Sequence, residues 1–294
     1  MSGNTPEPIF DAALAVAHKV RAVRAAVPGA DFLMRRAADD LADRLDAVPR
    51  RFDAAAAFFS LTPAAGEALA ASGKAKEVVR VEADAALLAG HDGRVAAPET
   101  VPFEPDSLDL AVSLYSLHEV NDVPGMLVQI RRALRPDGLF LGCMAGAGTL
   151  QELREALLAA ETELTGGASP RVAPLVDVRD AGALLQRAGF ALPVADHETV
   201  TVRYDSMFAL MRDLRAMGAT SSLVARSRKP MRRALLMRAA EIYAERFSDP
   251  DGRVRATFST IWLSGWAPHE SQQQPARRGS ATVSLAKILG ERKN

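Results

Sequence analysis

The residues with the clearest potential for chemistry are a neighbouring histidine and glutamate, His118 and Glu119, which follow the apolar run Leu108 to Leu114. That run is continuous rather than alternating, which is typical of a strand in a parallel sheet with both faces covered. Ligands of such sheets collect at the carboxyl ends of the strands. The sequence therefore places a site near residues 113–122 and 145–148. His118 and Glu119 could border the reacting group there, and the alternative is a structural histidine with its hydrogen bonds satisfied.

The elements that would position these residues form a strand, a helix and a second strand. The helix has one apolar stripe, made of Val123, Leu127, Ile130 and Leu134. We expect it to end at Pro136, which cannot continue the hydrogen-bond ladder, with Gly138 supplying a positive φ. Residues 139–144 form the next buried strand. Such a unit buries its edges only within a larger α/β sheet.

Three patterns in this unit are informative together. They are F-x-x-x-S-x-D-L at 103–110, S-L-H-x-V-x-D at 116–122 and L-R-P-D-G-x-F at 134–140. In this order they resemble the class I S-adenosylmethionine-dependent methyltransferases. The resemblance implies a Rossmann-like α/β fold, with a mostly parallel seven-stranded sheet, helices on both faces, and extra helices at the N-terminal and C-terminal ends.

The same resemblance implies S-adenosylmethionine as cofactor and gives candidates for binding it. Glu82 ends the second strand, at the position where this fold usually binds the ribose hydroxyls through a carboxylate. The alternative is that Glu82 only caps the helix around residues 85–89. The other cofactor-binding candidates are Ser60, Ser113 and Leu114.

The first strand is expected over residues 52–59. The loop that follows this strand departs from the methyltransferase pattern. It reads AAAFFSLTPAAG, with Ala57 where the family has an acid and with Phe59, Leu61 and Pro63 where it has glycines. Glycines let the backbone approach the cofactor and adopt positive φ, and these residues lack that freedom. The sequence predicts that cofactor binding is weak, altered or lost. An error of register is the competing explanation, since glycines lie nearby in the chain.

Composition narrows the class of protein. Lys plus Arg and Asp plus Glu both count 36, so no global field attracts nucleic acid. No apolar run is long enough to span a membrane, and the first residues do not resemble a signal peptide, so we expect a cytoplasmic protein. The single cysteine, Cys143, lies in a buried strand and is expected to be an apolar filler. No metal site is predicted.

The chain divides into three predicted parts. Residues 1–48 form a helical flank or lid, residues 49–267 form the methyltransferase-like domain with a helical insertion at about 206–247, and residues 268–294 form a tail. Within the insertion, residues 226–233 carry a cluster of Arg and Lys. It is either a solvated face or a site for phosphate or an acidic partner.

A second resemblance covers nearly the whole chain. It is carried by G-T-L-x-E-L-R at 148–154, M-F-x-L-M-x-D-L-x-x-M-G at 207–218, H-E-S-Q at 269–272 and P-x-R-R-G-S-A-T-V-S at 275–284. These patterns resemble the bacterial and mitochondrial family of complex I assembly factor 5. The resemblance implies a protein client, a subunit of respiratory complex I, and hydroxylation of an arginine in it.

Three functions follow from these patterns. The first is an S-adenosylmethionine-dependent enzyme that modifies a protein, and the second is a non-catalytic assembly module on the same scaffold. Neutral net charge argues against the third, a nucleic-acid methyltransferase. The sequence predicts no oligomeric state.

Overall fold

The sheet has seven strands in the order β3-β2-β1-β4-β5-β7-β6. The computed structural model describes residues 7–167 and 169–273. The strands are β1 Phe52–Phe58, β2 Ala75–Glu82, β3 Arg94–Val95, β4 Leu108–Leu114, β5 Leu134–Ala145, β6 Ala191–Tyr204 and β7 Val254–Trp266. Only β7 runs antiparallel to its neighbours. The predicted seven-stranded, mostly parallel α/β sheet is confirmed.

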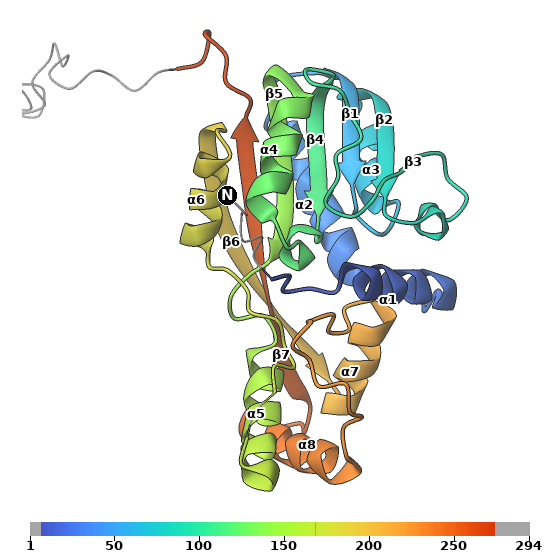
Figure 1. Cartoon of the computed structure of the whole chain (residues 1–294), viewed down its shortest axis with the longest axis vertical. Coiled ribbons are helices and arrows are strands. Elements are labelled where there is room, and N and C mark those ends of the chain that lie inside the picture. The colour runs from blue at the N-terminus through green and yellow to red at the C-terminus, as the bar shows by residue number, and fades with distance from the viewer. Residues whose placement is uncertain (1–6, 168, 274–294) are drawn as a thin grey trace, which may run out of the picture.

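Helices cover both faces of this sheet (Figure 1). The helices are α1 Ala12–Ala25, α2 Phe32–Asp46, α3 Ala64–Ala71, α4 Val123–Ala133, α5 Gln151–Thr165, α6 Val178–Arg187, α7 Met207–Ala216 and α8 Arg233–Phe247, with short 3-10 helices η1 Ala85–Leu88 and η2 Leu117–Glu119. Apolar residues of α4 and α6 share one core with the sheet. Those of α2 and α3 share a second core on the opposite face.

A second lobe lies at the far end of the two longest paired strands (Figure 1). β6 and β7 continue beyond the sheet and form a third core with α5, α7 and α8, which contains Leu157, Leu210, Tyr243 and Phe258. Helices α7 and α8 come between β6 and β7 in the chain, where the insertion is predicted. We call the two parts the sheet lobe and the helical lobe.

The N-terminal helix α1 lies where the two lobes meet (Figure 1). The backbone before it pairs with the segment joining α7 to α8, since Asp11 donates its N–H to the Ser222 carbonyl at 2.8 Å. His18 Nδ1 lies 2.9 Å from the Thr220 carbonyl. Asn121 fixes the same helix to the sheet lobe, because its side chain both accepts from and donates to the backbone of Phe10. α1 is therefore held by both lobes.

Two local predictions are wrong. Gly138 does not take the positive φ at the end of α4; its neighbour Asp137 does, with φ 65°. Gly138 is needed for space instead, since a Cβ there would lie 2.9 Å from the Arg135 carbonyl oxygen and 3.2 Å from that of Asp109. The alternation of apolar and polar residues over 197–204 predicts a strand there, but the strand begins earlier, at Ala191.

The predicted tail, residues 268–294, lies mostly outside the described residues. Within the described part, Gln272 donates to Asp137 Oδ1 at 2.9 Å and to the Ala267 carbonyl at 2.8 Å, which fixes residues up to 273 against the sheet lobe. The pattern at 275–284 lies outside the described residues.

Candidate functional site

A cleft of about 720 Å³ separates the two lobes beneath α1, and we call it the interlobe cleft. Its volume is in the range of pockets that enclose small molecules or long side chains. The sheet lobe contributes Leu61, Tyr115, His118 and Glu119, the helical lobe contributes Leu153, Leu157, Met211 and Leu214, and α1 contributes Lys19 and Ala22. The lining is mainly apolar. Both predicted catalytic candidates, His118 and Glu119, line it.

His118 is fixed at the base of the cleft by the backbone. The Ala145 N–H lies 3.4 Å from His118 Nδ1, which must accept this bond, so a neutral ring carries its proton on Nε2. Burial lowers the pKa of His118, although the charge of Glu119 opposes that effect. The imidazole is therefore neutral near pH 7, and its hydrogen-bonded Nδ1 fits the structural role as well as a role beside a substrate.

Glu119 carries the negative charge at the base of the cleft. Its Oε2 lies 2.7 Å from Lys19 Nζ, and both side chains are largely shielded from solvent. Burial raises the pKa of Glu119, but the charge of Lys19, and that of His118 at low pH where its ring is protonated, outweigh it and leave the pKa below its usual value. The carboxylate is ionised at neutral pH, with a lysine from α1 as its counter-ion. Lys19 has no signal in the sequence, because no local pattern indicates which surface this amphipathic helix faces.

The predicted ribose ligand, Glu82, is 2% exposed and does not line the cleft. Its carboxylate lies 3.3 Å from Nη2 of Arg80, which also donates to the Leu87 carbonyl. Burial raises the pKa of Glu82 to about 7, and Arg80 opposes this effect. The alternative role as a helix cap is wrong, since Asp84 accepts the Ala86 N–H at the start of η1. Glu82 serves an internal pair with Arg80.

The other cofactor-binding candidates also use their polar groups within the protein. Ser60 Oγ accepts the Leu114 N–H at 3.1 Å and ties the loop after β1 to β4. Ser113 Oγ lies 2.5 Å from Ser116 Oγ. The four cofactor-binding candidates are all buried, and none of them lines the cleft; they are Ser60, Glu82, Ser113 and Leu114.

The loop after β1 follows a glycine-like path without glycines. Phe59 and Leu61 adopt the left-handed region, with φ 52° and 60°, so the prediction that these positions lack that conformation is wrong. An L-residue there costs roughly 1–2 kcal/mol. Phe59 packs against the core that the sheet shares with α4 and α6, whereas Leu61 and Pro63 line the cleft. Their side chains stand where a glycine loop leaves room for the cofactor.

These residues do not fit S-adenosylmethionine as this fold ordinarily holds it. Glu82 is bound to Arg80, the Ser60 and Ser113 hydroxyls have internal partners, and Leu61 and Pro63 narrow the loop side of the cleft. The backbone path that would receive the cofactor is nevertheless retained. The obstacle consists of side chains, which substitution can remove.

Tyr115 is a further cleft residue without a sequence signal. It adopts φ 50° directly after β4, and its hydroxyl lies 2.6 Å from Thr260 Oγ1 of β7. Its ring meets that of His118 edge-on, with centroids 6.4 Å apart. The left-handed backbone turns the Tyr115 side chain into the cleft. There its hydroxyl links the end of β4 to β7, the strand that both lobes share.

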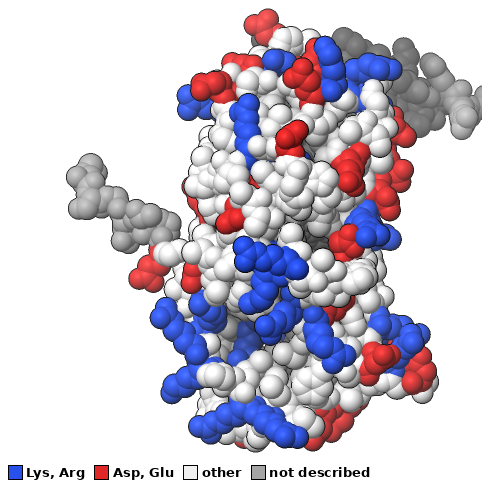
Figure 2. Space-filling model, turned by 90° about the vertical axis from the view of Figure 1, so that its right-hand side faces the viewer, with Lys and Arg blue, Asp and Glu red and all other residues white. Residues whose placement is uncertain are grey.

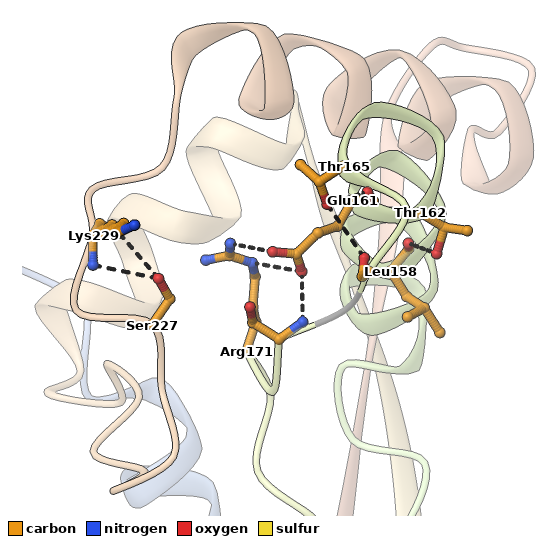
Figure 3. A network of polar contacts seen from close by, with 9 residues as sticks. Leu158, Glu161, Thr162, Thr165, Arg171, Ser227 and Lys229 are labelled. Atoms are coloured by element: carbon orange, nitrogen blue, oxygen red, sulfur yellow. Dashed lines mark hydrogen bonds and ion pairs between the residues drawn. The ribbon is translucent and has the colours of Figure 1, made fainter.

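One wall of the cleft, residues 170–175, is fixed by a buried ion pair (Figure 3). Arg171 Nη2 lies 2.7 Å from Glu161 Oε1, and Glu161 Oε2 accepts the Ser169 N–H at 2.9 Å. Burial raises the pKa of Glu161, but Arg171 and Ser169 outweigh this effect and lower it overall. The ionised pair anchors the wall to α5.

Residues 7–167 and 169–273 do not meet the requirements of a metal site, a cysteine nucleophile or a membrane-spanning helix. Within these ranges no cluster of three His, Cys, Asp or Glu side chains could hold a metal ion. Cys143 is fully buried, and burial raises its pKa to about 12, which makes the thiol an apolar filler rather than a nucleophile. None of the helices in these ranges is both long and apolar enough for a membrane span.

Comparisons with known proteins agree with this architecture. Residues 61–142 match a family model described as a methyltransferase domain. A crystal structure described as a candidate methyltransferase from Bacillus halodurans superimposes with a TM-score of 0.51 and 14% identity, over 78% of this chain and 98% of that one. At this identity the match shows the fold alone. It confirms the predicted Rossmann-like methyltransferase fold.

Two relatives share a name and much more of the sequence. "Arginine-hydroxylase NDUFAF5, mitochondrial" of Homo sapiens is 39% identical over 293 residues, which cover 95% of this chain and 83% of that protein. The Danio rerio protein of that name is 44% identical over 195 residues, 66% of this chain and only 60% of that protein. Both names contain the word mitochondrial, which contradicts the prediction of a cytoplasmic protein.

Proposed function

This chain belongs to the family of the arginine hydroxylase NDUFAF5, and on that premise we propose that it holds an arginine side chain of a protein client in the interlobe cleft. The client that the family resemblance implies is a subunit of respiratory complex I. The implied modification is hydroxylation of that arginine, in which a C–H bond becomes C–OH and an external oxidant supplies the oxygen atom and accepts the two electrons. The match covers only part of the zebrafish relative, so activity and client are both part of the proposal.

The observation that carries this proposal is the ion pair of Glu119 and Lys19. The pair supplies an ionised carboxylate in an apolar cleft, 2.7 Å from a primary ammonium group. A carboxylate binds a guanidinium through two parallel hydrogen bonds, whereas an ammonium group binds as a point charge. A client arginine would replace Lys19 on Glu119. The apolar lining would then pack against the aliphatic part of the arginine side chain.

A second candidate, a non-catalytic assembly module, is favoured by the loop after β1. Leu61 and Pro63 line the cleft on the side where the fold usually admits the cofactor, and Glu82 is engaged with Arg80. Such a module would bind the client at the same place without changing it. Methyl transfer from S-adenosylmethionine would require the cofactor to displace both features.

Peptide binding tests the proposal directly. The full-length protein is titrated with a labelled peptide from a complex I subunit containing one arginine, and with the same peptide carrying citrulline, which keeps the shape without the charge. We expect the citrulline peptide to bind about tenfold more weakly, as expected for loss of a buried charge-assisted contact. Glu119→Gln should remove this preference. Glu104→Gln, an exposed carboxyl outside the cleft, serves as the matched control.

Equal affinity for both peptides in the unsubstituted protein would refute the proposal. Mass spectrometry of the bound peptide separates the two candidates. A gain of one oxygen atom on the arginine in a mitochondrial extract, dependent on added protein, supports the enzyme. An unchanged peptide that still binds in an arginine-dependent manner supports the assembly module.

A further inference from the structure

Two segments beside the interlobe cleft, helix α1 and residues 212–233, are strongly basic, although the chain as a whole has no net charge. Residues 212–233 contain seven Arg or Lys and a single acid, Asp213. Helix α1 contains three Arg or Lys and no acid. The two segments lie together, because Gly218 packs against Lys19 and Ala22 of α1. The positive charge of both is therefore concentrated on one surface.

Most of these cations are exposed and available to a partner. We define the basic rim as Arg21, Arg24, Arg215, Arg228, Lys229 and Arg232. All six are exposed, and none forms an ion pair with another residue in the described part of the chain. Figure 2 shows Lys and Arg side chains gathered over the middle and lower part of this face. The field of such a group is not cancelled locally.

The rim is continuous with the cleft that contains Glu119. The cleft is lined by Arg215 of the rim and by Lys19 and Arg226. Arg21 and Arg226 both approach the buried His18, whose pKa is lowered by burial and further by these two charges. A chain that inserts one side chain into the cleft beside α1 would therefore lie next to the rim.

The chemistry of the rim favours an acidic polypeptide over a nucleic acid. Single-stranded nucleic acids bind through basic grooves with aromatic side chains on which the bases stack. Neither α1 nor residues 212–233 contain Phe, Tyr or Trp. The nucleic-acid reading therefore lacks the stacking surface that it needs, whereas an acidic polypeptide needs only the exposed cations.

We propose that the basic rim docks an acidic segment of the protein client that flanks the arginine held by Glu119. This inference rests on the proposed function. It further specifies that the client sequence on either side of the modified arginine is acidic. The protein would then recognise two features of the client, an arginine side chain within the cleft and acidic side chains on the rim outside it. A client whose arginine lies among basic residues would be repelled at the rim.

The test measures binding of two arginine peptides to the full-length protein by fluorescence anisotropy over a salt series. One peptide has glutamates on both sides of the arginine, and the other has glutamines. We expect the glutamate peptide to bind about tenfold more tightly at low salt, and this advantage to shrink as salt screens the exposed charges. Charge reversal of the rim by Arg228→Glu, Lys229→Glu and Arg232→Glu should abolish the advantage.

The matched control reverses three exposed cations elsewhere, by Lys76→Glu, Arg179→Glu and Arg187→Glu, with the same change in net charge. An equal loss in the rim and control variants, or no loss in the rim variant, would overturn the inference. Rim-dependent binding of a single-stranded oligonucleotide, or of phosphatidylserine vesicles, as tight as that of the glutamate peptide would also overturn it.

Failure of the inference is distinguishable from failure of the proposed function. If glutamates give no advantage but citrulline still weakens binding, the rim inference fails and the arginine site stands. If glutamates give the advantage but citrulline has no effect, the rim binds acidic segments and the arginine site fails. Equal thermal unfolding of both charge-reversal variants and the unsubstituted protein shows that folding is unchanged.

Discussion

Lys19 Nζ lies 2.7 Å from Glu119 Oε2, so a lysine of the N-terminal helix neutralises the one carboxylate at the base of the cleft. The two residues are far apart in the sequence and belong to different parts of the fold. This contact explains why Glu119 remains ionised in an apolar cleft. It also joins α1 to the candidate site, so that access to Glu119 and the position of α1 are coupled.

The first prediction concerns the pH dependence of this pair. The pKa of Glu119 is lowered in the folded protein, so its contribution to stability is present above the unfolded pKa and is lost as pH falls through the folded pKa. Lys19→Met should cost about 2 kcal/mol near neutral pH, as expected for a charged hydrogen bond, and less at about pH 3, below the ordinary pKa of 4.5. Urea denaturation at the two pH values measures this difference. Lys76→Met, at an exposed lysine, should show no such dependence, and an equal cost at both pH values would contradict the prediction.

The second prediction has the opposite sign and concerns Glu82. Burial raises its pKa to about 7 from an ordinary value of 4.5. Between these values the folded protein holds a proton that the unfolded chain has lost, so stability falls as pH rises from 4.5 to about 7. Glu82→Gln should remove this part of the decline. Denaturation midpoints measured through that range test the slope, and an identical slope in the variant would count against it.

The third prediction compares two adjacent alanines at the end of α1. Ala26 adopts φ 44° at the C-cap, whereas Ala25 is the last helical residue, and both are exposed. Ala26→Gly should stabilise the protein by about 1 kcal/mol, because glycine adopts the left-handed region without strain. Ala25→Gly should destabilise it by about 0.5–1 kcal/mol through the loss of helix propensity. The two melting temperatures should therefore move in opposite directions, and a shift of the same sign would refute this account.

The fourth prediction concerns the cofactor. Leu61 already has φ 60°, so Leu61→Gly together with Pro63→Gly removes side chains from the cleft without requiring a new backbone path at position 61. With about 1 mM S-adenosylmethionine, the double variant should show a larger thermal shift than the unsubstituted protein. Phe59→Gly is the control, because Phe59 packs against the core and its loss should lower stability without improving binding. Equal shifts for the double variant and the unsubstituted protein would show that these side chains are not the obstacle.

The parts of the fold that follow local patterns could be predicted from the sequence. The continuous apolar run of β4 and the single apolar stripe of α4 are properties of adjacent residues, and both appear where expected. The early start of β6 could not be predicted, because Pro193, which cannot donate to a strand ladder, lies within residues 191–196 and argues against a strand there. The role of Gly138 could not be predicted either, because part of the crowding that requires glycine there comes from the Asp109 carbonyl oxygen, which is distant in the chain.

The candidate site was predictable only where it follows the carboxyl end of a strand. His118 and Glu119 line the cleft because they follow β4. Lys19 depends on how α1 packs across two lobes, which no local pattern records. Glu82 occupies the expected position, but Arg80, two residues earlier on the same strand, takes its carboxylate. Position in the fold was therefore predictable, whereas the partner of each charged group was not.

The pairing of β6 with β7, which is regular from Val194 onward, has a mechanical consequence. These strands remain paired from Ala191 and Trp266 in the sheet lobe to Tyr204 and Val254 in the helical lobe. A hinge rotation between the lobes would have to bend this two-stranded ribbon and shear its hydrogen bonds. Entry of a client side chain should therefore leave the relative position of the two lobes unchanged.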